Sequence, residues 1–433
     1  MFTDNTCNSR RSFSWLVRSC VPDPKATHIL LPIHRNRAHL LPYSTTATVT
    51  TSFTSLPDDL LVECLSRLPL SSLPSISLVC SRFHNVLDTP AFLNHRRSHG
   101  LIRRSILALT VSDIGLLSSA SYSIDHDAGQ KPVTWEIFPY PLPLPSTVHF
   151  CNSYSFSHAR LAVLGRFVYV LARGVAVRYD TWTEAITSCS PFLFPRKKFA
   201  IGVIDGKIYV AGGTSRTSAV EVYDPLTDIW RVVSEAPRKR YGCLGTSANG
   251  AFYVIGGLKI GGNGPTSTHG VESAHVYAST MDAYDVVAGT WLRTRPIPDG
   301  GCAVGACSVG SHVYVLASHA VEVSFWRWER KGRRFVRGEW ERLRAPPVPG
   351  QVHVNGALRF SCVGVEENRI AVVVHVSDIG DSTRRMGIGL NGQNGWLVKD
   401  GAALWYNIST DEWCRGADLP VAFRKAACVC VEC

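Results

Sequence analysis

Long hydrophobic runs are missing from this chain of 433 residues. A membrane-spanning helix needs about 18 or more consecutive apolar residues. The best candidate, Ile106 to Ile124, is interrupted by Asp113 and by several serines. The apolar runs that do occur have the length of single strands. The sequence therefore predicts no membrane segment and no membrane partner.

A compact cysteine framework is also lacking, although the chain contains 14 cysteines. They are scattered, no secretory signal precedes them, and residues such as Cys243 lie within apolar patterns, where cysteine behaves as a small hydrophobe. We expect reduced thiols in a protein of the cytoplasm, the nucleus or both. Cys428, Cys430 and Cys433 are closely spaced, but no second His/Cys group completes a tetrahedral site. No metal and no cofactor is predicted.

No pattern typical of a catalytic site stands out. Gly387 to Gly392 matches the dinucleotide-binding pattern, but the strand and helix that give this pattern its meaning are not predicted around it. The basic run Arg327 to Arg334 has the aromatic residues of a nucleic-acid surface. Interleaved acidic residues such as Glu329 and Glu339 favour a solvated hairpin instead. We predict no enzyme and no nucleic-acid partner, and the net charge of +11 suits an acidic partner.

What the chain does contain is a four-strand pattern, clearest from Pro195 to Trp230. β-Branched and aromatic runs alternate with tight turns, and the Asp-Gly pair between two of them is a strong hairpin signal. A Tyr-Asp or Tyr-Asn pair recurs with a Trp six residues after its second member, in the segments 223–230, 284–291 and 406–413. A four-strand unit that repeats at intervals of roughly 40–50 residues or more is the signature of a β-propeller blade.

These residues resemble kelch repeats, and the resemblance implies an all-β propeller over residues 105–433. The pattern predicts about six four-stranded blades, with five or seven as alternatives because two repeats are weak. The positions that close the six blades are Trp135, Ile186, Trp230, Trp291, Trp340 and Trp413. The N-terminal blade is one strand short. Arg424 to Val431 resembles a first strand with nothing after it. We therefore expect the C-terminal strand to close the N-terminal blade, which removes two open sheet edges.

The segment 53–97 has a different, helical character. Pro57 fits the first position of a helix, and Ser72 and Thr89 can begin two more. Three short helices cannot bury all their leucines among themselves, so an apolar face should remain for a partner. Residues 1–52 are basic and rich in Ser and Thr, and we predict a disordered extension, with an organellar targeting segment as the alternative.

The segment 53–97 resembles an F-box, because Leu-Pro-Asp-Asp-Leu-Leu, Leu-Ser-Arg-Leu-Pro, Leu-Val-Cys-Ser-Arg-Phe and Pro-Ala-Phe follow in that order from Leu56 to Phe92. The resemblance implies docking onto the Skp-family adaptor of a cullin–RING ubiquitin ligase. The matching contact positions are Leu56, Pro57, Leu60, Leu65, Val79 and Phe83. A helical subdomain that binds nothing is the alternative.

Basic residues gather at the starts of the first strands of successive blades: Arg160, Arg196, Lys198, Arg238, Arg240 and Arg424. Equivalent positions in a ring would place them around one mouth of the propeller. There they could bind an acidic or phosphorylated segment of a protein substrate. Alternatively, they bridge neighbouring blades by pairing with carboxylates such as Glu221 or Asp224.

The sequence as a whole is similar to plant F-box/kelch-repeat proteins over residues 55–433. This resemblance implies a substrate-recognition subunit of an SCF-type ubiquitin ligase, in which the F-box binds the adaptor and the propeller binds the protein to be ubiquitinated. A propeller that acts as a scaffold outside any ligase is one alternative. A propeller copper oxidase is another, but the histidines show no cluster in the sequence that would serve as ligands.

Overall fold

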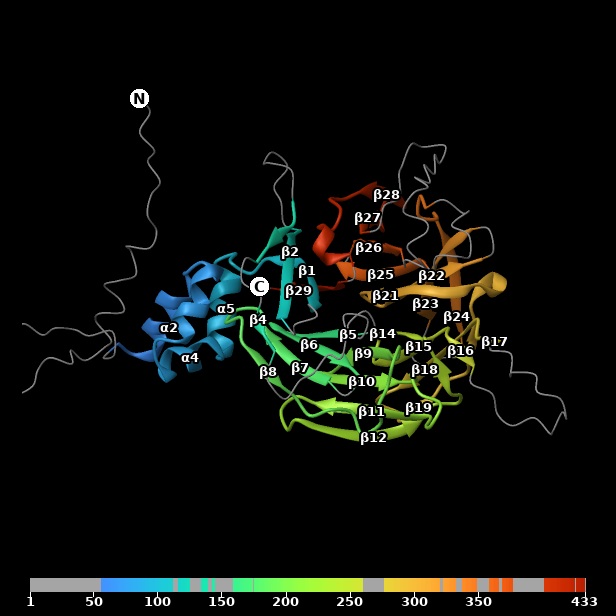
Figure 1. The fold of residues 1–433 in the computed structure, drawn as a ribbon, viewed down its shortest axis with the longest axis horizontal. Coiled ribbons are helices and arrows are strands. Elements are labelled where there is room, and N and C mark those ends of the chain that lie inside the picture. Colours follow the sequence, from blue (N-terminus) through green and yellow to red (C-terminus); the bar gives the residue numbers. More distant parts are fainter. Residues whose placement is uncertain are drawn as a thin grey trace, which may run out of the picture. The chain divides into compact units, whose positions relative to one another are not determined.

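The structure is a computed structural model of the chain (Figure 1). It describes residues 56–111, 116–124, 134–138, 142–144, 159–173, 175–259, 276–319, 322–331, 337–348, 358–365, 368–376, 401–424 and 426–432. The predicted N-terminal extension 1–52 and the glycine pattern 387–392 lie outside the described residues. No helix in the described part is both long and apolar enough to cross a membrane. The chain divides into two compact units, Met1–Ile102 and Arg103–Cys433.

The described residues of the first unit, here called the helical unit, form short helices: α2 (Asp58–Ser66), η3 (Leu70–Ser72), α3 (Leu73–Ser77), α4 (Ser81–Leu87) and α5 (Pro90–Ser98). Pro57 is the residue before α2 rather than its first residue. Thr89 caps α5, because its hydroxyl accepts the backbone N–H of Phe92 at 3.2 Å. The second predicted helix is divided into α3 and α4, because Cys80 between them has an extended backbone.

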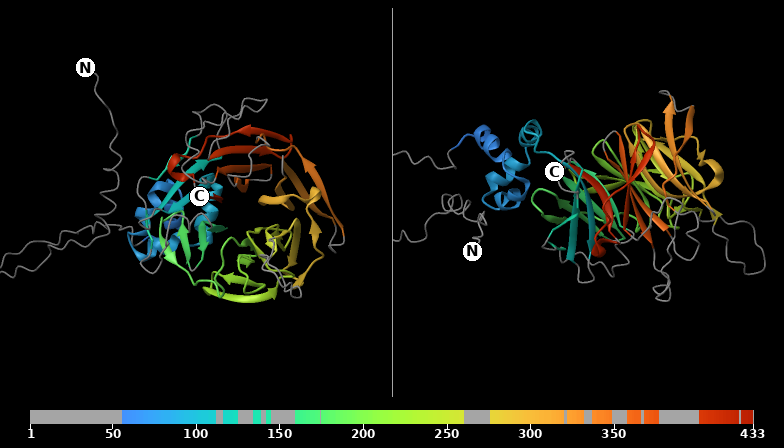
Figure 2. Two further views of the ribbon diagram at one scale, coloured as in Figure 1. Left: turned by 45° about the vertical axis from the view of Figure 1, so that its right-hand side comes forward. Right: turned by 90° about the horizontal axis from the view of Figure 1, so that it is seen from above.

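The second unit is a β-propeller, and Figure 2 shows its sheets arranged in a ring. Blade 1 contains β29 (Ala427–Glu432), β1 (Arg104–Val111), β2 (Leu116–Ser123) and β3 (Glu136–Ile137), with β4 (Leu142–Pro143) also on β2. Blade 2 contains β5 (Arg160–Leu164), β6 (Phe167–Ala172), β7 (Val175–Asp180) and β8 (Ile186–Ser188). Blade 3 contains β9 (Ala200–Ile204), β10 (Lys207–Ala211), β11 (Ala219–Asp224) and β12 (Ile229–Glu235).

Three further blades complete the propeller. Blade 4 contains β14 (Leu244–Ala248), β15 (Ala251–Ile255), β18 (Thr280–Asp285) and β19 (Thr290–Trp291), with β20 (Arg295–Pro296) also on β18. Blade 5 contains β21 (Cys302–Val309), β22 (His312–Ser318), β23 (Val323–Lys331) and β24 (Arg337–Leu343). Blade 6 contains β25 (Leu358–Val365), β26 (Arg369–Val376), β27 (Ala402–Asn407) and β28 (Glu412–Arg415). The predicted count of six is confirmed.

Three two-residue strands form a small sheet separate from the blades. It consists of β13 (Arg240–Tyr241), β16 (Leu258–Lys259) and β17 (Val276–Tyr277). Short 3₁₀ turns at Pro298–Gly300 and Val421–Phe423 lead into β21 and towards β29. The described part of the basic run, residues 327–331, lies on β23, which pairs with β24, and Arg327 forms an ion pair with Glu341 of β24. These contacts agree with the interpretation of that run as a hairpin.

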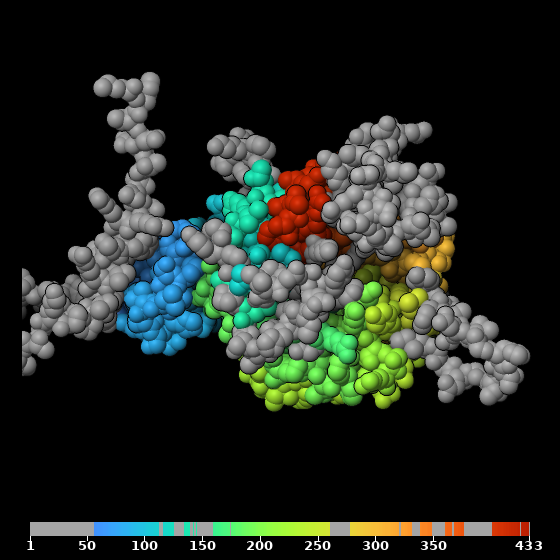
Figure 3. Space-filling model, viewed as in Figure 1, coloured from blue at the N-terminus to red at the C-terminus, as the bar shows by residue number. Residues whose placement is uncertain are grey.

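The innermost strands of the blades contact one another in the order β5, β9, β14, β21, β25, β29 and back to β5. The C-terminal strand β29 pairs antiparallel with β1, from Ala427 opposite Leu109 to Glu432 opposite Arg104. In the space-filling view the red C-terminal part lies against the teal residues of blade 1 (Figure 3). The predicted closure of the N-terminal blade by the C-terminal strand is therefore confirmed.

Outer tryptophans connect successive blades. Trp230 donates its indole N–H to the carbonyl of Ser190, which follows the last strand of blade 2, at 2.8 Å. Trp413 donates in the same way to Arg344, which follows the last strand of blade 5, also at 2.8 Å. Tyr223 and Tyr406 are the cross-strand partners of these two tryptophans. The recurring Tyr–Trp spacing thus marks the seam between neighbouring blades.

Candidate functional site

The predicted adaptor-contact residues fall into two groups within the helical unit (blue in Figure 3). Pro57 and Leu60 are exposed, and Leu60 keeps 49% of its surface accessible to solvent. Leu56 and Val79 are half-buried. These four positions are available to a partner, and their role as adaptor contacts stays a prediction.

Leu65 and Phe83 were expected at the same surface, but the structure places them inside the helical unit. They are only 4% and 1% exposed and pack in its core. A side chain buried in this way contributes to stability and does not touch a partner directly. The contact role expected for these two residues is therefore wrong, and their part is to hold the helices together.

Leu78 is the apolar surface residue that the sequence did not single out. It is 85% exposed at the C-terminus of α3. It lies between the apolar stripes of α3 and α4, so helical periodicity alone gave no signal for it. A hollow of about 490 Å³ also opens on this unit, lined by Asp58, Asp59, Leu60, Val62, Glu63, Thr89, Ala91 and His95. Exposed leucines and a partly acidic hollow thus occupy the surface of the same small unit.

One group of potential metal ligands occurs among the described residues. Glu63, His95 and His99 bring ligand atoms within 4.8 Å of one another. Glu63 is already engaged, because it pairs with Arg67 one turn later and with Nδ1 of His95 at 2.6 Å. The hydrogen bond from Arg67 is the main cause of a lowered pKa of Glu63. An ion-paired carboxylate between α2 and α5 accounts for this cluster.

In blade 3, the predicted basic residue Arg196 is fully buried. Its Nη2 lies 2.6 Å from a carboxylate oxygen of Glu221, which belongs to β11 of the same blade. The guanidinium also donates to the carbonyls of Gly212 and Ala219 at 2.7 and 2.6 Å. The guanidinium group of Arg196 is thus fully paired inside the blade. Arg196 cannot bind a substrate directly, and the ion-pair alternative holds, although within one blade rather than between blades.

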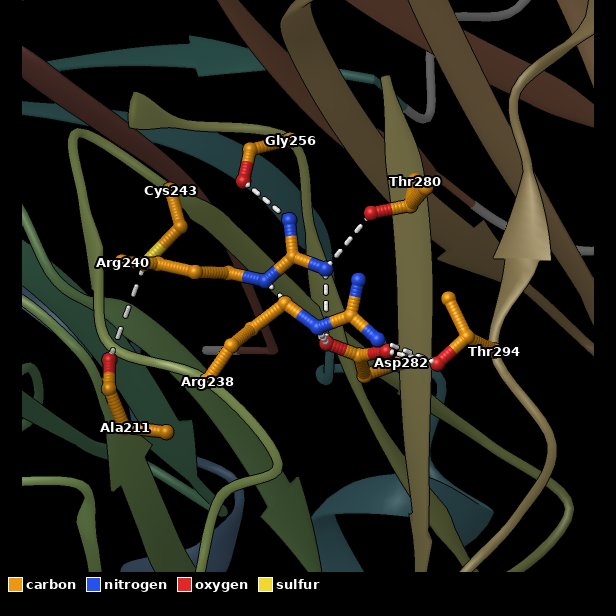
Figure 4. Close-up of polar contacts among 8 residues, drawn as sticks. All are labelled: Ala211, Arg238, Arg240, Cys243, Gly256, Thr280, Asp282 and Thr294. Atoms are coloured by element: carbon orange, nitrogen blue, oxygen red, sulfur yellow. Dashed lines mark hydrogen bonds and ion pairs between the residues drawn. The ribbon is translucent and has the colours of Figure 1, made fainter. Parts of the chain in front are cut away.

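Blade 4 repeats this arrangement with Arg240 and Asp282 (Figure 4). Arg240 is buried, and its Nη2 lies 2.6 Å from a carboxylate oxygen of Asp282. It also donates to the carbonyl of Gly256 at 2.7 Å. Arg238 approaches the same carboxylate at 3.4 Å and donates to the hydroxyl of Thr294 at 2.8 Å. These arginines therefore stabilise the blade, and the expectation that Arg240 faces a substrate is wrong.

The remaining predicted basic residues do not share equivalent positions. Arg160 lies opposite Leu171, whereas Ala200, and not Arg196, lies at the matching position of blade 3. Nε of Arg160 donates to the carbonyl of Phe199 at 3.0 Å. The ammonium group of Lys198 lies 5.9 Å from the centre of the Tyr241 ring. Arg424 is exposed after the turn Val421–Phe423. The six residues therefore do not form the regular ring that the sequence suggested.

Three basic residues outside the predicted set, together with buried Arg196, surround a cavity of about 420 Å³ in the propeller, here called the basic cavity. Its lining is Arg173, Phe194, Pro195, Arg196, Lys197, Gly213, Thr214, Ser215, Arg216 and Tyr241. Arg173, Lys197 and Arg216 are exposed there. The sequence gave a weak signal for the first of them, because Ala172-Arg173 stands where blades 3 and 4 have Gly-Gly. Nothing in the sequence separated exposed Lys197 from its buried neighbour Arg196.

Comparisons with known proteins agree with the two units. A model of the F-box domain matches residues 53–95, and a model of the Kelch motif matches residues 195–237. An F-box/kelch-repeat protein of Arabidopsis thaliana is 46% identical, covering 98% of this chain and 99% of that protein. A second Arabidopsis F-box/kelch-repeat protein is 25% identical over 55% of this chain and 61% of its own length.

Among solved structures, the structure of YjhT matches with a TM-score of 0.46 and 19% identity, and the match covers 64% of this chain and 86% of that one. The Arabidopsis relative, in contrast, is similar along nearly the whole of both sequences. The order of the units is also the same as in the name of that family, with an F-box before a kelch propeller. The chain therefore belongs to the F-box/kelch-repeat protein family.

Proposed function

We propose that this protein is the substrate-recognition subunit of an SCF-type ubiquitin ligase and has no catalytic activity of its own. In this proposal the helical unit binds a Skp-family adaptor, and through it a cullin–RING ligase, while the propeller binds the protein to be ubiquitinated. Membership of the F-box/kelch-repeat family supports a role as a substrate adaptor. The chemistry of ubiquitin transfer would belong to the other subunits.

The observation that carries the proposal is the exposure of large apolar side chains on a very small unit. Leu60 and Leu78 expose 49% and 85% of their surfaces. Burying such exposed apolar surface against a partner is favourable, because it removes the surface from water. The buried leucines and phenylalanines beneath it make the unit a stable platform. An apolar partner surface, such as that of an adaptor, would cover these exposed side chains.

The proposed mechanism is proximity. Holding a substrate lysine close to a charged ubiquitin carrier raises the effective concentration of the two reactants without any new chemistry. The chain then needs two binding surfaces and no reactive group. The described propeller offers a basic cavity for one of them, and the helical unit offers exposed leucines for the other.

The experiment that tests the proposal is co-purification with a Skp-family adaptor. Leu60→Asp and Leu78→Asp should each reduce adaptor capture at least tenfold, because each places a charge in an apolar contact. Leu226→Asp is the matched control, since Leu226 is 96% exposed on a turn of the propeller. Thermal unfolding should be unchanged in all three variants. Wild-type protein that captures no adaptor at all would favour a scaffold outside any ligase.

A further inference from the structure

The basic cavity has an unusual balance of charge. The described residues that line it include Arg173, Lys197 and Arg216 but no Asp or Glu. None of these three forms a salt bridge with any described residue, whereas buried Arg196 in the same wall is paired with Glu221 at 2.6 Å. Three positive charges thus gather around one hollow without an internal counter-charge. Such a hollow attracts anions and holds them more strongly than a flat surface does.

The cavity lies where blades 2 and 3 meet the small separate sheet that contains β13. Arg173 follows β6 of blade 2, Lys197 and Arg216 come from loops before β9 and before β11 of blade 3, and Tyr241 belongs to β13. A ligand seated there would contact two blades and the small sheet at once. Its volume of about 420 Å³ is within the range of ordinary ligand sites. It can accommodate one anionic side chain together with part of the peptide that carries it.

Backbone hydrogen bonds fix the loops that form the cavity. The N–H of Lys197 donates to the carbonyl of Gly213 at 2.9 Å, and the N–H of Gly213 donates to the carbonyl of Arg240 at 2.8 Å. Arg196 ties the same loops together from beneath through its bond to Gly212. Gly213 has a φ of +75°, and a Cβ there would lie 2.7 Å from Cβ of Phe199. The cavity is therefore preorganised, which lowers the cost of binding.

We propose that the basic cavity binds a phosphorylated side chain of the substrate protein. The proposal rests on the proposed function and names the chemical class that the propeller recognises. Two guanidinium groups offer paired N–H donors that match phosphate oxygens, and a lysine adds a point charge. Thr214 and Ser215 add hydroxyl donors to the same lining. A phosphate ester carries close to two negative charges at neutral pH, so it balances three cations better than a single carboxylate does.

The lining also explains why the ligand should be a peptide rather than free phosphate. Phe194 and Tyr241 supply aromatic surface beside the cations, and Pro195 adds to it. Such surface packs against the aliphatic and ring parts of residues next to the phosphorylated one. Free phosphate would use only the charged part of the cavity. We therefore expect binding that needs both the phosphate and the neighbouring residues.

The test uses the full-length protein and three immobilised peptide libraries of the same design: phosphorylated, unphosphorylated, and with Glu in place of the phosphorylated residue. The phosphorylated library should bind at least tenfold more tightly than the other two. Arg173→Glu and Arg216→Glu should each weaken that binding at least tenfold, since each loses a charge-assisted hydrogen bond. Arg231→Glu, on the exposed outer strand β12, is the matched control and should bind as the wild type does.

Four results would overturn the proposal: equal binding of the phosphorylated and unphosphorylated libraries, equal or better binding of the Glu library, unchanged binding by both cavity variants, or preferential binding of single-stranded RNA offered as a competitor. Adaptor capture is measured on the same samples. If Arg173→Glu and Arg216→Glu lose phosphopeptide binding but still co-purify with the adaptor, both proposals stand. If the adaptor is bound but phosphopeptides are not, only the cavity proposal fails.

Discussion

Blades 3 and 4 solve a packing problem with charge that blades 2, 5 and 6 solve without it. The residue that pairs with a valine of the second strand is Glu221 in blade 3 and Asp282 in blade 4. The same register position holds apolar residues in the other three blades, namely Val177, Trp326 and Leu404. All five side chains are buried. The position therefore does not require a carboxylate.

The comparison shows that the charged solution is made of inseparable parts. Glu221 forms an ion pair with buried Arg196, and Asp282 forms one with buried Arg240. Val177, in contrast, packs in an apolar cluster. A buried ion pair roughly offsets the loss of hydration of its two charges, but a single buried charge does not. Blades of one ring can thus carry either solution, provided that both halves change together.

The largest expected effect comes from removing one half of the pair. Glu221→Ala leaves the guanidinium of Arg196 buried without its counter-charge, and we expect a loss of about 3–5 kcal/mol in the free energy of unfolding. Urea denaturation measures it. Glu412→Ala, at an exposed position on β28, is the control and should change stability by less than about 0.5 kcal/mol. A loss below about 1 kcal/mol for Glu221→Ala would contradict the proposed dependence of Arg196 on its partner.

A smaller effect is expected from Asp282→Asn in blade 4. The amide keeps the shape of the side chain and one acceptor oxygen, but it removes the charge that faces Arg238 and Arg240 at 3.4 and 2.6 Å. We expect a loss of about 2 kcal/mol, because hydrogen bonds to a charged group contribute about 1.5–3 kcal/mol. The shift in urea midpoint measures it. An unchanged midpoint would mean that the hydrogen bonds to Gly256 and Thr280 suffice.

Converting blade 3 to the apolar solution should cost less than either single change. In Arg196→Met/Glu221→Val both charges are removed and the position acquires the residue that blade 2 has. Such replacements are often neutral or stabilising, so we expect a net change of about 1 kcal/mol or less. The double-mutant cycle should give a coupling energy above about 2 kcal/mol. Additive single effects would show that the two residues act independently.

The smallest effect concerns a buried titratable group that has no ionic partner. Burial raises the pKa of Cys307 in blade 5 to about 12. Its thiol therefore stays neutral in the folded protein, and native-state labelling at pH 8 should spare it while modifying exposed Cys64 and Cys80. Because the unfolded thiol ionises near pH 9, the contribution of Cys307 to stability should be complete below that pH and decline above it. Labelling of Cys307 as fast as of Cys64 would contradict this.

Strand-level features were predictable from the sequence because they depend on local patterns. The turn at Asp205–Gly206 and the Tyr–Trp spacing placed the blades, and an unpaired first strand at the C-terminus indicated the closure. These features follow from periodicity and turn chemistry, which a short window contains. The same reasoning found the helical unit, whereas Leu60 was named through the resemblance to an F-box.

The direction of individual side chains was not predictable. Arg196 and Lys197 are neighbours with the same sign of charge, yet one is buried beneath the basic cavity and the other is exposed at its rim. What decides between them is the position of Glu221, which is 25 residues away in sequence. The contact role predicted for Leu65 and Phe83 was wrong for the same reason, since only the packed helices show which side of an apolar stripe is covered. Burial of this kind depends on tertiary contacts that no local pattern contains.

The pairing of β29 with β1 sets an order for biosynthesis. Each of blades 2 to 6 consists of strands from one continuous part of the chain, so each can form once that part has left the ribosome. Blade 1 has to wait for residues 427–432, and until then β1 presents an unpaired edge to the crowded cell. A nonsense mutation just before Ala427 would make that wait permanent. Such a product would be a ready client for chaperones and for the degradation machinery itself.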